Sequence, residues 1–130
     1  MTPMGLKRET KLSYDQALAA LPEALKSEGF GIITEVDIKQ TLKNKIGVDI
    51  RRYKVLGACN PHFANEALAN DIDIGFMLPC NVAVYEADDG HAVVSAINPA
   101  VAMANHESPG LVALAAKVRD RLAQALGKLG

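Results

Sequence analysis

Two Cys-Asn dipeptides carry the residue types in this chain that are best suited to chemistry. Cys59-Asn60 and Cys80-Asn81 contain the two cysteines of the 130 residues, and each dipeptide has a proline within two positions. A thiolate is a nucleophile and a metal ligand, and an asparagine amide both donates and accepts hydrogen bonds. Their types and their apolar surroundings therefore predict either a thiol site or a site that binds a small polar or anionic ligand through Cys59, Asn60, Cys80 and Asn81.

The pair Asn60-Pro61 is typical of a helix start, because asparagine is a favoured N-cap and proline is favoured at the first helical position. Exposed amides at that helix end could stabilise a Cys59 thiolate or hold a carboxylate or phosphate group. The opposing interpretation is that Cys59 packs as a small apolar residue and that Asn60 is used up as the cap. Packing also explains Cys80, whereas Asn81 has no capping role.

Cooperation between the two thiols depends on the direction of two predicted strands, 50–58 and 76–86. If these strands are parallel, Cys80 lies about four residues, or ~13 Å, from the level of Cys59. If they are antiparallel, Cα atoms within ~7 Å would permit a disulfide or a shared ligand. The sequence leaves both directions open. An alternative function is therefore a thiol-dependent redox protein or enzyme, with Cys59 as the attacking thiolate and Cys80 as its resolving partner.

Histidines supply the remaining candidates for a metal site. His62 has a Cys-x-x-His spacing with Cys59, and His106 lies in a later loop. Structural zinc sites usually have tighter paired spacings, and a histidine at the second position of a helix is more often solvated. We therefore expect no metal and no other cofactor.

Hydrophobic periodicity and turn signals define the elements that position these residues. The helix that starts at 13–16 has Ser13 as N-cap and Gln16 as its capping-box partner, and Gly29 follows its end. In order, the pattern predicts a strand at 6–10, that helix, a strand at 30–38, a short helix at 37–46, a strand at 50–58, a helix at 61–71, a hairpin of strands 76–86 and 91–97, and a C-terminal helix after Ser108-Pro109.

This order predicts an α+β fold in one domain over residues 1–130. The turn Asp88-Asp89-Gly90 makes the last two strands antiparallel. An apolar stripe along the C-terminal helix predicts that this helix covers the sheet. We expect two layers, with a mixed, mostly antiparallel sheet and the helices packed on one face.

Charge and composition exclude several classes of partner. The 14 basic and 15 acidic side chains leave a formal charge of -1, so we expect no nucleic acid and no anionic membrane surface as the main partner. No apolar run approaches the ~20 residues that cross a bilayer, and residues 1–10 lack the apolar centre of a signal peptide. These features predict a cytoplasmic protein whose two cysteines remain free thiols.

Two segments resemble a known family. LGACNP at 56–61 and MLPCNVAVYE at 77–86 are similar to the bacterial and archaeal family called domain of unknown function 302. The similarity extends upstream through 29–31 and 35–45 and downstream through 96–99, so it covers nearly the whole chain. The resemblance implies a compact α+β domain that forms a homodimer. The family has no settled activity to carry over to these residues.

Together these observations predict a cytoplasmic, homodimeric module that binds or senses a small polar or anionic ligand. Two alternatives remain. One is the thiol-dependent redox protein or enzyme, so the sequence does not decide whether a reaction is catalysed. The other is a purely structural or interaction module, in which the Cys-Asn segments hold strand ends and a dimer interface.

Overall fold

A computed structural model describes residues 5–130, so the first four residues of the predicted domain lie outside the described part. Its elements follow the predicted order with two additions, a 3-10 helix named η1 before the hairpin and the short helix α4 after it. They are β1 (Gly5–Ser13), α1 (Tyr14–Lys26), β2 (Gly31–Asp37), α2 (Ile38–Ile46), β3 (Tyr53–Cys59), α3 (Pro61–Asn70), η1 (Ile72–Met77), β4 (Cys80–Glu86), β5 (His91–Ile97), α4 (Pro99–Ala102) and α5 (Pro109–Gly127).

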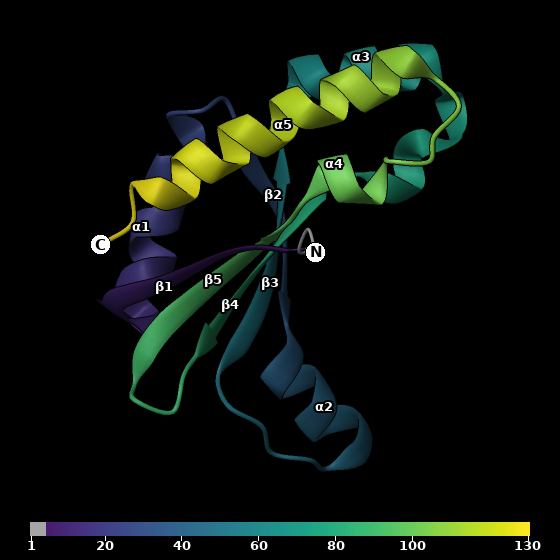
Figure 1. Cartoon of the computed structure of the whole chain (residues 1–130). Coiled ribbons are helices and arrows are strands. Elements are labelled where there is room, and N and C mark those ends of the chain that lie inside the picture. Colours follow the sequence, from purple (N-terminus) through teal and green to yellow (C-terminus); the bar gives the residue numbers. More distant parts are fainter. Residues whose placement is uncertain (1–4) are drawn as a thin grey trace.

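The strands form one five-stranded sheet in the order β1-β5-β4-β3-β2, and each neighbouring pair is antiparallel. Helices α1 and α5 cover one face of this sheet, and α3 lies alongside α5 (Figure 1). Helix α2 stands apart from that layer and contacts β2 and β3. The predicted α+β fold with helices on one face is confirmed, and the described sheet is antiparallel throughout. No helix in residues 5–130 combines the length and apolar character needed to cross a bilayer.

Side-chain caps begin the helices where the sequence predicts them. The Gln16 amide donates to Ser13 Oγ at 3.1 Å, and the Ser13 amide donates back to Gln16 Oε1 at 2.9 Å, which completes the capping box. Asn60, Asn98 and Ser108 cap α3, α4 and α5 in the same way, each followed by proline. Local sequence therefore sets the points at which the chain turns from strand into helix.

The core lies between the sheet and the α1–α5 layer. Leu21 and Leu25 of α1 and Leu122 of α5 are fully buried, as are Val82 and Val84 of β4. The predicted stripe of α5 is buried along its whole length: Leu111, Leu114, Val118, Leu122, Ala125 and Leu129. Burying one such large side chain contributes about 1.5–3 kcal/mol, so this stripe holds α5 on the domain.

The predicted strand 76–86 is wrong in its first part, because β4 begins only at Cys80. Residues before it form η1, whose start is capped by Asp71 through a 3.0 Å hydrogen bond from the Asp73 amide. The short helix buries Ile74, and Pro79, which has no amide hydrogen for a strand ladder, follows it. Local capping and the burial of one side chain thus outweigh the strand preference of the sequence.

Candidate functional site

The antiparallel pairing of β3 with β4 brings the two Cys-Asn segments together. Ala58 is paired with Cys80 and Gly57 with Asn81, so Cys59 lies one residue beyond the Ala58–Cys80 pair. This register answers the question of strand direction that the sequence leaves open. Both cysteines are free thiols.

Successive side chains of a strand point to opposite faces of the sheet. The four predicted ligand residues therefore do not all point the same way. Cys80 points the same way as Ala58, into the helix-covered face, and Asn60 is buried at the start of α3. Asn81 is exposed and points the opposite way with Cys59. The structure therefore brings Asn60 and Cys80 into the lining of one cavity, whereas Cys59 and Asn81 are not among the described residues that line it.

Asn60 is engaged as a helix cap. Its Oδ1 accepts hydrogen bonds from the amides of His62 at 3.2 Å and Phe63 at 3.3 Å. Its Nδ2 lies 2.8 Å from the position that a Cβ would take on Gly29, which shows how closely the amide packs on that backbone. An anion at this helix end would need the two amides that Asn60 already binds, so the start of α3 does not form the predicted anion site.

Cys80 is a neutral thiol. Burial, and to a smaller extent the neighbouring Cys59, raises the pKa of Cys80 from 9.0 to about 11. At pH 8 the thiol then exceeds the thiolate by about a thousandfold, and only the thiolate is a good nucleophile. Cys80 is therefore an apolar lining group and a poor partner for the thiol chemistry that the sequence offers as an alternative.

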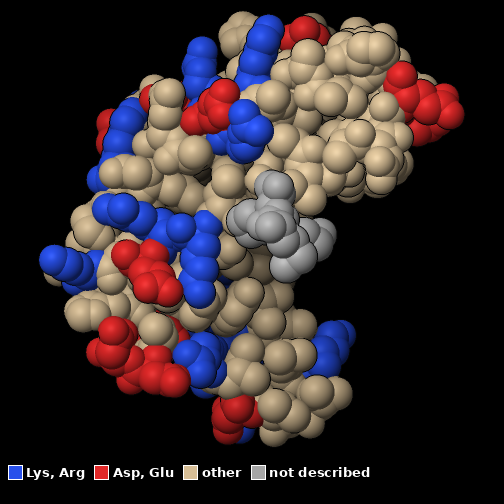
Figure 2. All heavy atoms as spheres, viewed as in Figure 1, with Lys and Arg blue, Asp and Glu red and all other residues tan. Residues whose placement is uncertain are grey.

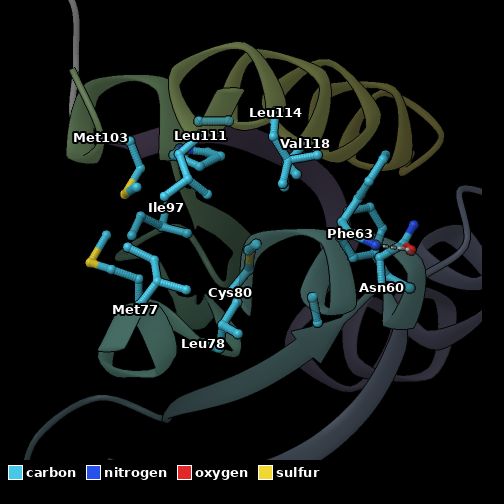
Figure 3. Close-up of a pocket in the computed structure, with 16 residues that line it drawn as sticks. Asn60, Phe63, Met77, Leu78, Cys80, Ile97, Met103, Leu111, Leu114 and Val118 are labelled. Atoms are coloured by element: carbon cyan, nitrogen blue, oxygen red, sulfur yellow. Dashed lines mark hydrogen bonds between the residues drawn. The ribbon is translucent and has the colours of Figure 1, made fainter. Parts of the chain in front are cut away.

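A cavity of about 70 Å³ lies between α3, η1, α4 and α5, at the helix-covered ends of β4 and β5 (Figure 3). Among its described lining residues, Asn60 alone has a polar amide side chain. The lining consists of Phe30, Asn60, Phe63, Ala64, Ala67, Ile74, Met77, Leu78, Cys80, Ile97, Pro99, Met103, Leu111, Leu114, Ala115 and Val118. Three of these residues are alanines, whose short side chains leave space between the facing helices.

The cavity has two different ends. Met77 and Met103 lie at one end, Phe63 lies at the other with Asn60 beyond it, and Cys80 lies between them (Figure 3). Methionine side chains are unbranched and adaptable, so the first end can change shape at low cost. At the other end the guanidinium of Arg121 lies over the Phe63 ring, 5.9 Å from its centre.

His106 connects the loop before α5 to the end of α3. The Ser108 amide donates to His106 Nδ1 at 2.9 Å, so the ring proton resides on Nε2 and is donated to Asp71 Oδ2 at 3.0 Å. This hydrogen bond, and to a smaller extent the one from the Asp73 amide, lowers the pKa of Asp71.

The metal-ligand candidates of the sequence do not come together. Both ring nitrogens of His106 are engaged, and His62 is exposed at the first turn of α3. Across residues 5–130, no three His, Cys, Asp or Glu side chains are grouped closely enough to hold a metal ion.

Sequence reasoning missed the cavity. Neither Met77 and Met103 nor the alanines of α3 are assigned to a site by the sequence motifs. The available signal was the combination of Ala64 and Ala67 on one helix face with Ala115 on a facing helix. Without the topology, nothing in the sequence indicates that these small residues face one another.

Fold and site together define a small α+β domain with a five-stranded antiparallel sheet and an apolar cavity beneath its helical layer. A family model described as "Domain of unknown function DUF302" matches residues 6–129, and the chain belongs to this family, as its sequence motifs predict. The fold is similar to the crystal structure of an uncharacterized conserved DUF302 protein from Bacillus stearothermophilus, with a TM-score of 0.91 and 26% sequence identity over 99% of this chain and 100% of that one. A comparison with curated proteins gave no match.

Proposed function

We propose that this domain is a homodimeric module that binds or senses a small ligand, and that the ligand occupies the cavity beneath α3 and α5. The cavity itself carries the proposal. Protein interiors are packed as densely as organic crystals, whereas here a space of about 70 Å³ remains between apolar side chains. A ligand that fills it recovers dispersion contacts that the lining otherwise lacks.

The lining favours an apolar ligand over the polar or anionic one that the sequence predicts. Asn60 binds its own helix, and Cys80 presents a neutral thiol. The remaining lining groups are aliphatic, aromatic or thioether side chains. A buried carboxylate or phosphate would lose its hydration here without gaining hydrogen bonds, which is a cost of several kcal/mol.

A methyl NMR titration with xenon tests the cavity as a binding site. Xenon enters dry apolar cavities, so it should shift the methyl signals of Leu114 and Met103 and leave those of Leu21 unchanged. Replacing Ala64 with leucine fills the cavity and should abolish these shifts. The matched control is Ala69→Leu on the exposed side of the same helix, which should keep them. Absence of xenon shifts in the wild-type protein would contradict the proposal.

The homodimer is supported by the exposed edge strand β2. Ile33 and Val36 are 61% and 46% exposed on this strand, and an edge strand offers free backbone groups for pairing with a second copy. Ile33→Lys should therefore convert dimer to monomer in light scattering. Ile46→Lys, at a 67% exposed position on α2, should not. A monomeric wild-type protein would refute this part of the proposal.

We also propose a cytoplasmic location, which two free cysteines support. Free cysteines are typical of proteins in reducing compartments, and both cysteines of this chain are free. Fractionation of cells that express a tagged chain tests the location. Recovery from the medium or the membrane fraction would contradict it.

A further inference from the structure

The chain segment that lines most of the cavity contains acidic residues but no lysine or arginine. No lysine or arginine occurs from Val55 to Ala116, although acidic residues recur there. This segment supplies every described lining residue except Phe30 and Val118. In the view of Figure 2 the basic side chains gather over α1, α5 and β1, whereas the lobe that contains α3 and α4 shows acidic and uncharged surface.

The Met77–Met103 end of the cavity belongs to this segment without lysine or arginine. Arg121 lies over the ring of Phe63 at one end of the cavity, while the other end is formed by Met77 and Met103, beside η1 and the loop before α5. Asp73, four residues before Met77 on η1, and Glu107 in that loop are exposed acidic residues. A head group left outside the cavity at this end therefore meets carboxylates and no cation from its own segment.

The size of the cavity restricts the part of the ligand that enters. Its volume of about 70 Å³ is about half of the roughly 150 Å³ that accommodates a benzene ring in an engineered apolar cavity. A short aliphatic chain fits this space without rearrangement of the lining. Longer chains require the adaptable Met77 and Met103 side chains to move.

We propose that the cavity takes the aliphatic tail of a compound whose head group is neutral or cationic, with the tail inserted between Met77 and Met103 and the head group left beside η1. The inference rests on the proposed function, because it names the ligand class of that same cavity. Acidic surface around a low-dielectric opening concentrates cations and repels anions. A carboxylate of equal chain length is therefore the compound that the site rejects.

Three four-carbon probes separate these head groups: butan-1-ol, butylamine and butyrate, titrated at pH 7 and low salt while the Leu114 and Met103 methyl signals are followed. Butan-1-ol and butylamine should bind, with butylamine about thirtyfold tighter than butyrate, the factor expected when the sign of one unit charge near 4 Å from a carboxylate is reversed in water. Added salt should reduce this preference. Asp73→Asn should also reduce it, whereas the matched change Asp49→Asn, in the distant loop after α2, should not.

Binding of butyrate would be as informative as binding of the other two probes. Equal or tighter binding of butyrate overturns the inference, and loss of that binding in Arg121→Gln would place the head group at the Phe63 end. Xenon serves as the reference that separates this inference from the proposed function. If xenon binds and none of the three probes does, the ligand class is wrong and the cavity remains a binding site. If xenon also fails to bind, both proposals fall.

Discussion

The two halves of helix α5 pack against partners of different size. In its C-terminal half, Leu122 is fully buried and belongs to the same core as the fully buried Leu21 and Leu25 of α1. In its N-terminal half, Leu114 faces a cavity that it shares with Ala64 and Ala67 of α3. One helix thus contributes to a filled core at one end and to an unfilled one at the other.

This difference separates a densely packed part of the domain from a part in which a cavity remains. Leucines of α1 fill the interior against the sheet, and each contributes the full free energy of burial. The alanines of α3 leave room, so the neighbouring side chains lack contacts that only a guest can supply. Stability should therefore depend mainly on the α1 end, and binding on the α3 end.

Truncating one leucine in each half of α5 tests whether the two halves differ in packing. Leu122→Ala leaves a new void in a filled region and should lower the free energy of unfolding by about 4 kcal/mol, whereas Leu114→Ala enlarges an existing space and should cost about 2 kcal/mol. Urea unfolding of both variants measures the difference. Equal losses would show that the two halves are packed alike.

The environment of Cys80 predicts a loss of stability at alkaline pH. Below pH 9.0 the thiol is neutral in both states; between there and about 11 it ionises only in the unfolded chain, so rising pH favours unfolding. Over this range the wild-type protein should lose about 2 kcal/mol more than Cys80→Ala. Parallel unfolding curves for the two proteins across this pH range would show that Cys80 is not in an apolar site.

Filling the cavity with a larger side chain should stabilise the domain. Ala64→Leu adds apolar contacts within the cavity and should raise the free energy of unfolding by about 0.5–1 kcal/mol. Ala69→Leu, on the exposed side of the same helix, adds none and should leave stability nearly unchanged. A clear destabilisation of the Ala64 variant would mean that the lining cannot accept extra volume.

The smallest effect concerns the hydrogen bond between Asp71 and His106. Because this bond lowers the pKa of Asp71, its contribution is present above the ordinary value of 3.8 and is lost as pH falls through the lowered pKa. Asp71→Asn should therefore be slightly less stable than the wild-type protein at pH 7, and the difference should shrink in acid. A difference of constant size at all pH values would contradict a charge-dependent role.

The sequence predicts most of the fold because its strongest signals are local. Ser13, Asn60, Asn98 and Ser108 cap helices in the structure as their types indicate. The turn at Gly90, with φ of 86°, joins the predicted hairpin. Each of these signals acts within four residues and needs no knowledge of the rest of the chain.

The candidate site was harder to predict because it depends on contacts between distant segments. Cys59 and Cys80 do lie on adjacent strands, but only the register shows that their side chains point in opposite directions. The cavity lies between α3 and α5, and two alanines that line it, Ala64 and Ala115, are some 50 residues apart in the sequence. Composition and periodicity say nothing of such pairings, so the apolar cavity could not be predicted from the sequence.

A crystal of the wild-type protein under xenon pressure tests the central claim most directly, because it locates an apolar guest in both halves of α5 at once. We expect a xenon atom between Cys80 and Leu114 in the wild-type crystal, no xenon there in crystals of Ala64→Leu, and none between Leu21 and Leu122. No xenon near Cys80 in the wild-type crystal, or xenon beside Leu122 instead, would contradict it.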